Sequence, residues 1–205
     1  MRTQQIMTVL QDSLDLDLVR TEHFETNAHF RGGWEVWLQC EIAMAFFNNA
    51  TSQSFEREVP YPSGNALLPY LSYNNATHAV AEVANPSARA DFKVERLAGA
   101  ADTTFLELKC QKSTETVGQA WSRLEDDVYK IDALAAANDT LNCTALLASW
   151  GTFTAEEMRN LTWCWTNRSS YVLDYSQNPP LLTSLQNVAL DGNDRQFIIG
   201  ISQTL

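Results

Sequence analysis

The stretches RADFKVERL (residues 89–97) and TTFLELKCQ (residues 103–111) decide the fold of this chain. In both, polar and apolar residues alternate with a period of two, which is the pattern of a half-buried β-strand. The residues that join them, AGAAD at 98–102, are small and turn-forming. Because successive side chains of a strand point to opposite faces, the sequence predicts a β-hairpin with one charged face and one apolar face.

The charged face of the predicted hairpin combines carboxylates with lysines. Its members are Asp91, Lys93 and Glu95 on the first strand and Glu107, Lys109 and Gln111 on the second. An Asp and a Glu on adjacent strands, with a Lys two residues after the Glu, suit a divalent-metal phosphodiesterase. Mg²⁺ takes oxygen ligands, a bound metal lowers the pKa of its water, and a nearby lysine orients that water or stabilises developing charge. A simpler interpretation is a solvated strand face whose Lys93, Glu95, Glu107 and Lys109 pair across the strands.

The order Asp91, then Glu107-Leu108-Lys109, resembles the motif of the PD-(D/E)xK nuclease superfamily, which has the restriction-endonuclease-like fold. Ala90 stands where the motif has its proline, and the resemblance covers roughly residues 32–150. It implies that Asp91 and Glu107 bind Mg²⁺ or Mn²⁺, with the Leu108 carbonyl as a candidate third ligand. It also implies that Lys109 positions or activates the attacking water.

A further carboxylate in such families often comes from a helix that precedes the hairpin, and Glu35 holds that place here. Glu35 also has a plain structural interpretation, because an acid in the first turn of a helix complements the helix dipole. The predicted helix, residues 34–48, is apolar nearly all round, which predicts burial.

The remaining patterns complete the order helix, strand, hairpin, helix, strand, helix, strand. A first strand is predicted at 53–62, a turn with a short helix at 63–78 and a short strand at 79–83. An apolar stripe predicts a long helix over residues 117–138, and Thr116 with Gln119 fits a capping box at its start. In some branches of the superfamily a glutamine after the ExK strand reaches the site, but for Gln119 we favour the cap. Further elements are an amphipathic helix within 1–30, a buried strand at 143–150, a short helix at 154–161 and strands at 171–175 and 197–202.

These elements predict an α/β fold with a mixed central sheet flanked by helices, as in a restriction-endonuclease-like core. The chain is predicted to form one domain over residues 1–205, with the core at about 32–150 and an N-terminal helix and C-terminal strands added to it. No apolar run is long enough to span a membrane, and the N-terminal stretch is too polar and acidic for a signal peptide. The predicted location is therefore cytoplasmic. The cysteines (Cys40, Cys110, Cys143 and Cys164) are scattered, and three lie in apolar stretches that predict buried thiols.

The net charge of −11 bears on both functional interpretations of the chain. Affinity for nucleic acid comes largely from Lys and Arg on phosphates, so an acidic nuclease needs its basic residues around the site. The first interpretation is a metal-dependent nuclease, acting on DNA rather than RNA by family analogy alone. The second is a catalytically inactive nuclease-fold binding protein, such as an acidic immunity or inhibitor protein for a basic protein partner. A basic rim around Asp91 favours the enzyme, and a uniformly acidic surface favours the binding protein.

Overall fold

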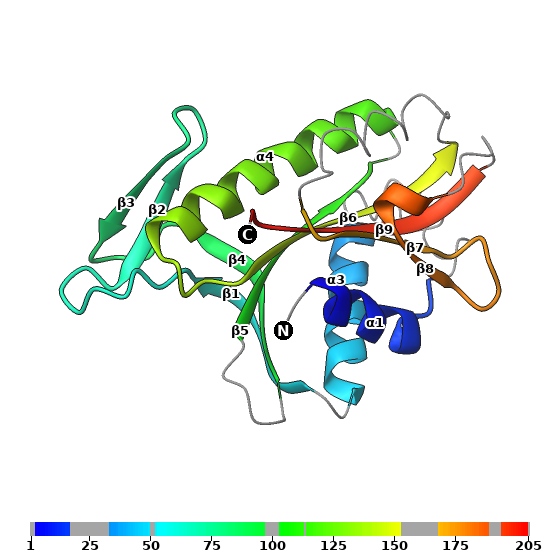
Figure 1. Cartoon of the computed structure of the whole chain (residues 1–205), viewed down its shortest axis with the longest axis horizontal. Helices are drawn as coiled ribbons and strands as arrows, with labels where there is room; N and C mark the ends of the chain where they lie inside the picture. Colours follow the sequence, from blue (N-terminus) through cyan, green and yellow to red (C-terminus); the bar gives the residue numbers. More distant parts are fainter. Residues whose placement is uncertain are drawn as a thin grey trace.

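The structure is a computed structural model, and it describes residues 3–16, 33–49, 52–96, 103–112, 114–152, 168–188 and 194–204. Within these ranges the chain forms a mixed seven-stranded sheet with helices on both faces, and a separate two-stranded sheet (Figure 1). The α/β class and the mixed central sheet are therefore confirmed. No helix of the described part is long and apolar enough to cross a membrane.

Apart from residues 63–78, the described elements follow the predicted order, and β8 and η2 are additional. The helices are α1 (Thr3–Ser13), α3 (Gly33–Asn48), α4 (Val117–Ala137) and the short 3-10 helix η2 (Leu185–Asn187). The main sheet has the spatial order β1 (Ser52–Pro60), β4 (Arg89–Arg96), β5 (Thr103–Cys110), β6 (Cys143–Thr152), β9 (Asp194–Ser202), β7 (Ser170–Asp174) and β8 (Leu181–Ser184). The second sheet pairs β2 (Tyr70–Asn74) with β3 (Ala79–Val83).

The predicted hairpin forms the second and third strands of this sheet. Strands β4 and β5 pair antiparallel, with Phe92 opposite Leu106 and Val94 opposite Thr104. Strand β5 then pairs parallel with β6, and α4 supplies the connection between them. The joining residues 97–102 and the helix predicted at 154–161 lie outside the described residues.

Apolar side chains fill both faces of the sheet. Figure 1 shows α4 across one face and α1 with α3 on the other. Phe105 on β5 and Leu124 on α4 belong to the first core, whereas Leu106 on β5 and Phe46 on α3 belong to the second. The alternation of β5 thus distributes its side chains between two cores, as the period of two requires.

Two local predictions at helix α4 and near β2 had different outcomes. The capping box is confirmed, because the Gln119 amide donates to Thr116 Oγ1 at 3.2 Å and the Thr116 amide donates to Gln119 Oε1 at 2.8 Å. Gln119 is therefore a capping residue.

The short helix predicted within 63–78 is wrong, since Tyr70–Asn74 forms β2. Pairing with β3 satisfies the backbone there, and Leu71 reaches the core beneath α4.

The expectation that the helix at 34–48 is buried all round is also wrong. Leu38, Ile42 and Phe46 are buried against the sheet and α1, but Val36, Met44 and Phe47 on the opposite side of α3 are exposed. Cys40, which lies on that side, is exposed, whereas Cys110 and Cys143 are buried as predicted. The reason is architectural, because the described elements that pack on α3, which are α1 and the sheet, lie against one side of it.

Candidate functional site

Strands β4 and β5 stop pairing at the position of the predicted carboxylates. The regular register ends at Phe92 and Leu106, so the next position along each strand carries Asp91 and Glu107. Here the Asp91 side chain replaces a backbone partner, because the Leu108 amide donates to Asp91 Oδ2 at 2.6 Å. The two strands thus bring Asp91 beside the Glu107-Leu108-Lys109 segment.

Glu107 is buried beneath α4, with 3% of its surface exposed. Its Oε1 atom accepts a hydrogen bond from the Tyr61 hydroxyl at 2.5 Å and an ion-paired one from Lys130 Nζ at 2.6 Å. Burial raises the pKa of Glu107 to about 7, against the opposing effect of Lys130. The negative charges of Asp127 and Asp91 act in the same direction as burial. Glu107 therefore changes charge near neutral pH.

Lys109 faces α4 on the same side of the strand. Its Nζ lies 2.9 Å from Asp127 Oδ2, which makes no hydrogen bond of good angular geometry to a described residue, so the contact is chiefly an ion pair. Burial lowers the pKa of Lys109, but the carboxylates of Asp127, Glu107 and Asp91 outweigh it, and the net pKa is above the ordinary value. Lys109 is therefore cationic at neutral pH.

Sequence reasoning missed the residues that face Glu107 and Lys109 from outside the hairpin. Asp127 and Lys130 are three residues apart on α4, so both reach the same neighbouring strand. Tyr61 follows β1 and is completely buried. The signal for the α4 pair was present, because an acid and a base border the apolar stripe of that helix. Only the packing of α4 across β5 shows which charges they meet.

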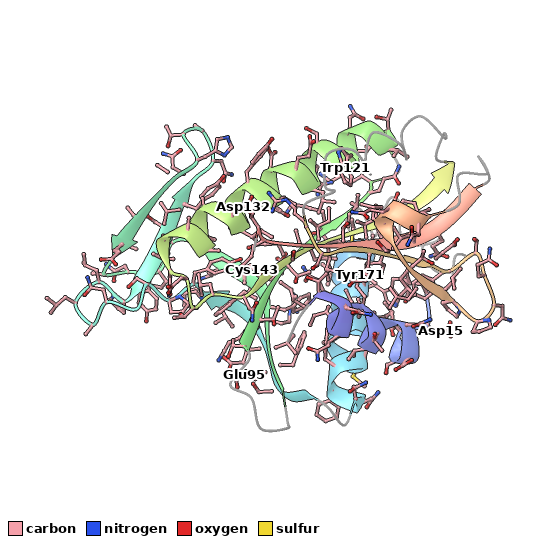
Figure 2. The ribbon with its side chains drawn as sticks, viewed as in Figure 1. Asp15, Glu95, Trp121, Asp132, Cys143 and Tyr171 are labelled. Atoms are coloured by element: carbon pink, nitrogen blue, oxygen red, sulfur yellow. The ribbon has the colours of Figure 1, made fainter. Side chains whose placement is uncertain are left out.

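The rest of the predicted charged face lies away from α4. Figure 2 labels Glu95, which is on β4 far from the helix that carries Trp121 and Asp132. Lys93 Nζ lies 2.8 Å from Glu95 Oε1 and 3.2 Å from Glu56 Oε1. Lys93 therefore pairs with Glu95 of its own strand and with Glu56 of β1, whereas Glu107 and Lys109 pair with α4. Pairing of these four residues across the hairpin is thus wrong.

Glu35 lies in the first turn of α3, at the edge of this group. Its nearest ion-pair partner among the described residues is Arg123, with Oε2 and Nη2 separated by 4.0 Å. Burial raises the pKa of Glu35, Lys109 and Arg123 oppose this, and Asp91 adds to it. The Trp34 indole holds the start of α3 in place by donating to the Gln111 carbonyl at 2.9 Å. Glu35 is thus within electrostatic range of Lys109 and Asp91 without contacting either directly.

Basic residues accompany the carboxylates of this group. Every lysine of the chain (Lys93, Lys109, Lys112 and Lys130) lies on β4, β5, α4 or the segment between β5 and α4. Arg123 is there too, and it donates to the Cys110 carbonyl and to both carboxylate oxygens of Glu115. Around Asp91, however, Lys109, Lys130 and Arg123 meet a larger set of acids, which are Glu35, Asp91, Glu107, Glu115 and Asp127. These described residues do not form a basic rim.

The oxygen atoms that remain available determine what the site could hold. Both hydrogen bonds to Glu107 use Oε1, and the bond to Asp91 uses Oδ2, so Glu107 Oε2 and Asp91 Oδ1 make none to the described residues. The Leu108 carbonyl points to the same edge of β5 as its amide, which faces Asp91. The described residues contain no cluster of three or more His, Cys, Asp or Glu arranged to hold a metal ion. The candidate donors are two carboxylates and one carbonyl.

In comparisons with known proteins, no protein-family model, no curated protein and no solved structure matches this chain. The functional argument accordingly rests on the geometry of the site.

Proposed function

We propose that this protein is a metal-dependent nuclease that hydrolyses phosphodiester bonds, with DNA favoured over RNA by family analogy. One observation carries the proposal. Asp91 and the Glu107-Leu108-Lys109 segment are adjacent where β4 and β5 separate, and available oxygen atoms lie beside a cationic lysine. This is the combination of hard oxygen ligands and positive charge that phosphodiester hydrolysis uses.

The arrangement of elements supports the restriction-endonuclease-like core as the finer description of the fold. Helix α3 precedes β1, the antiparallel strands β1, β4 and β5 follow, and α4 leads to β6, parallel to β5. This is the order that the resemblance to the PD-(D/E)xK superfamily implies. Under this proposal, β2 and β3 form a hairpin inserted between the first two core strands.

The donor set fits a hard divalent cation. Mg²⁺ is usually bound by one or two carboxylates and keeps several waters, so Asp91, Glu107 and the Leu108 carbonyl would suffice to hold it, or Mn²⁺ in its place. The bound ion would lower the pKa of a ligand water and offset charge on the phosphate. Lys130 would keep its contact with Glu107 Oε1, because the opposite carboxylate oxygen is the one available.

Lys109 would then position the attacking water and stabilise negative charge through its ammonium group. Its raised pKa argues against a role as general base, since it keeps its proton at neutral pH. Glu35 would act through Lys109, as an outer acid that influences it electrostatically.

The binding-protein alternative also has an observation in its favour. Glu107 and Lys109 each have an oppositely charged partner on α4, so the group is electrically satisfied without any ligand. In that case the four side chains would be a structural ion-pair network, and the acidic chain would bind a basic protein partner.

The test uses Asp91→Asn, because asparagine keeps an oxygen for the Leu108 amide and removes only the charge. Substituting Glu107 or Lys109 by Ala is less informative, because either change leaves a buried charge on α4 unpaired, which costs about 3–5 kcal/mol of stability. The matched control is Asp126→Asn, which neutralises an exposed acid on α4 outside the site.

Both variants and the wild type are incubated with single- and double-stranded DNA and with RNA, with Mg²⁺, with Mn²⁺ or with EDTA. The proposal expects metal-dependent cleavage by the wild type and by Asp126→Asn, and at least a hundredfold slower cleavage by Asp91→Asn. If the wild type cleaves no nucleic acid and neither metal raises its melting temperature, the binding-protein alternative replaces the nuclease.

A further inference from the structure

Helix α4 presents two oppositely charged side chains to strand β5. Asp127 Oδ2 lies 2.9 Å from Lys109 Nζ, and Lys130 Nζ lies 2.6 Å from Glu107 Oε1. The two spacings match, because residues three apart on a helix have Cβ atoms about 5–6 Å apart, and residues two apart on a strand lie about 7 Å apart on one face. Each charge of the β5 segment therefore meets its opposite on α4.

Lys109 has other carboxylates near it besides Asp127. Glu107 lies two residues away on the same strand, and the negative charges of Glu107 and Asp91 both act on Lys109. A lysine carries its ammonium group on a flexible four-carbon stem, so the group can turn from one acid to another. A direct pair with Glu107 Oε2 or Asp91 Oδ1 would occupy the oxygens that the described residues leave available. Lys109 and a divalent cation are therefore competitors for these two oxygens.

Asp127 is suited to prevent that competition. It is a buried acid, with 7% of its surface exposed, and loss of its cation would leave a carboxylate unpaired beneath α4. Its Oδ2 atom makes no hydrogen bond of good angular geometry to a described residue, so attraction between opposite charges holds Lys109 beside it. The effect of Asp127 on Lys109 therefore depends on the negative charge of the carboxylate.

We propose that Asp127 is a positioning residue that holds Lys109 away from Glu107 and Asp91, and so keeps their available oxygens open to a divalent cation. The inference rests on the proposed function, because it concerns the metal site of the nuclease. Asp127 is not itself a ligand in this scheme. Neutralising it weakens metal binding indirectly, because Lys109 then turns to the carboxylates that the metal needs.

The first experiment is a crystal structure of metal-free Asp127→Asn, which removes the charge and nearly preserves the shape of the side chain. Lys109 Nζ is expected within about 3.2 Å of a carboxylate oxygen of Glu107 or Asp91. A lysine that stays beside residue 127, or that turns to solvent, overturns the proposal. A variant that does not fold also overturns it, because Lys109 then has no alternative partner.

The second experiment measures Mn²⁺ affinity by calorimetry on the full chain, for the wild type, Asp127→Asn, Lys109→Met and the double variant. Asp127→Asn is expected to weaken Mn²⁺ binding at least about tenfold when Lys109 is present, and less than about threefold when residue 109 is methionine. The same loss in both backgrounds overturns the proposal, because Asp127 would then act on the metal directly. The control is Asp126→Asn, which removes an exposed charge from the same turn of α4 and should weaken binding less than about threefold.

The two experiments separate this inference from the proposed function. A wild type that binds metal, beside an Asp127→Asn variant of unchanged affinity, overturns the inference and leaves the nuclease proposal in place. A wild type that binds neither Mn²⁺ nor Mg²⁺ overturns the proposed function. The position of Lys109 in the crystal structure of Asp127→Asn then decides by itself whether Asp127 holds this lysine away from the two carboxylates.

Discussion

Replacing Glu107 by glutamine should remove a specific pH dependence of stability. Glu107 has an ordinary pKa of 4.5 and a pKa of about 7 in the folded protein. Below pH 4.5 the residue is protonated in both the folded and the unfolded state. Between pH 4.5 and 7 the unfolded chain releases this proton more readily, so the folded state loses stability as the pH rises. Each pKa unit corresponds to about 1.4 kcal/mol, so the rise in pKa from 4.5 to about 7 lowers the free energy of unfolding by about 3 kcal/mol across this range.

The assay is urea unfolding, followed by tryptophan fluorescence, of the wild type and Glu107→Gln between pH 4 and pH 8. The free energy of unfolding of the wild type minus that of the variant should fall by about 3 kcal/mol across this range, mostly between pH 4.5 and 7. Any static cost of the substitution, such as the altered contact with Lys130, appears as a constant offset.

A difference that stays constant with pH within about 0.5 kcal/mol would refute the reasoning, because Glu107 would then titrate alike in both states. The measurement does not require the protein to be an enzyme. Under the nuclease proposal, Mg²⁺ favours the ionised carboxylate, so saturating Mg²⁺ should reduce the fall in the wild type and leave Glu107→Gln unaffected.

Two further substitutions test the packing around the site. Lys130→Met leaves the buried Glu107 carboxylate without its cation, so it should lower the free energy of unfolding by about 3–5 kcal/mol at pH 8. The loss should be smaller at pH 5, where Glu107 takes up a proton. Urea unfolding at both pH values checks this against Lys112→Met, which should change the free energy of unfolding by less than about 0.5 kcal/mol. Gly200→Ala should destabilise the fold by about 1–3 kcal/mol, because its new Cβ would lie 2.6 Å from the Sδ atom of buried Met7, and an unchanged urea midpoint would show that α1 moves aside freely.

The local elements of the fold were predictable because their causes are local. The alternation in residues 89–97 and 103–111 specified β4 and β5, and the stripe over residues 117–138 specified α4 with its Thr116 cap. The apolar run at 143–150 specified a strand buried on both faces, which is β6. Periodicity and capping act between residues close in sequence, so the chain alone determines them. The same argument brought Asp91 to the Glu107-Leu108-Lys109 segment.

The electrostatic state of that site required the tertiary structure. The burial of Glu107 and the pairing of Lys109 depend on which turn of α4 packs across β5. The periodicity of the sequence does not specify how two elements align with each other. The extent of coverage of α3 is likewise a property of the assembled layers. An apolar helix predicts only that partners exist, and the packing of α1 and the sheet leaves Phe47 outside. Local sequence patterns specified the elements and the residues at the hairpin, while packing between distant elements decided the charges and the partners of those residues.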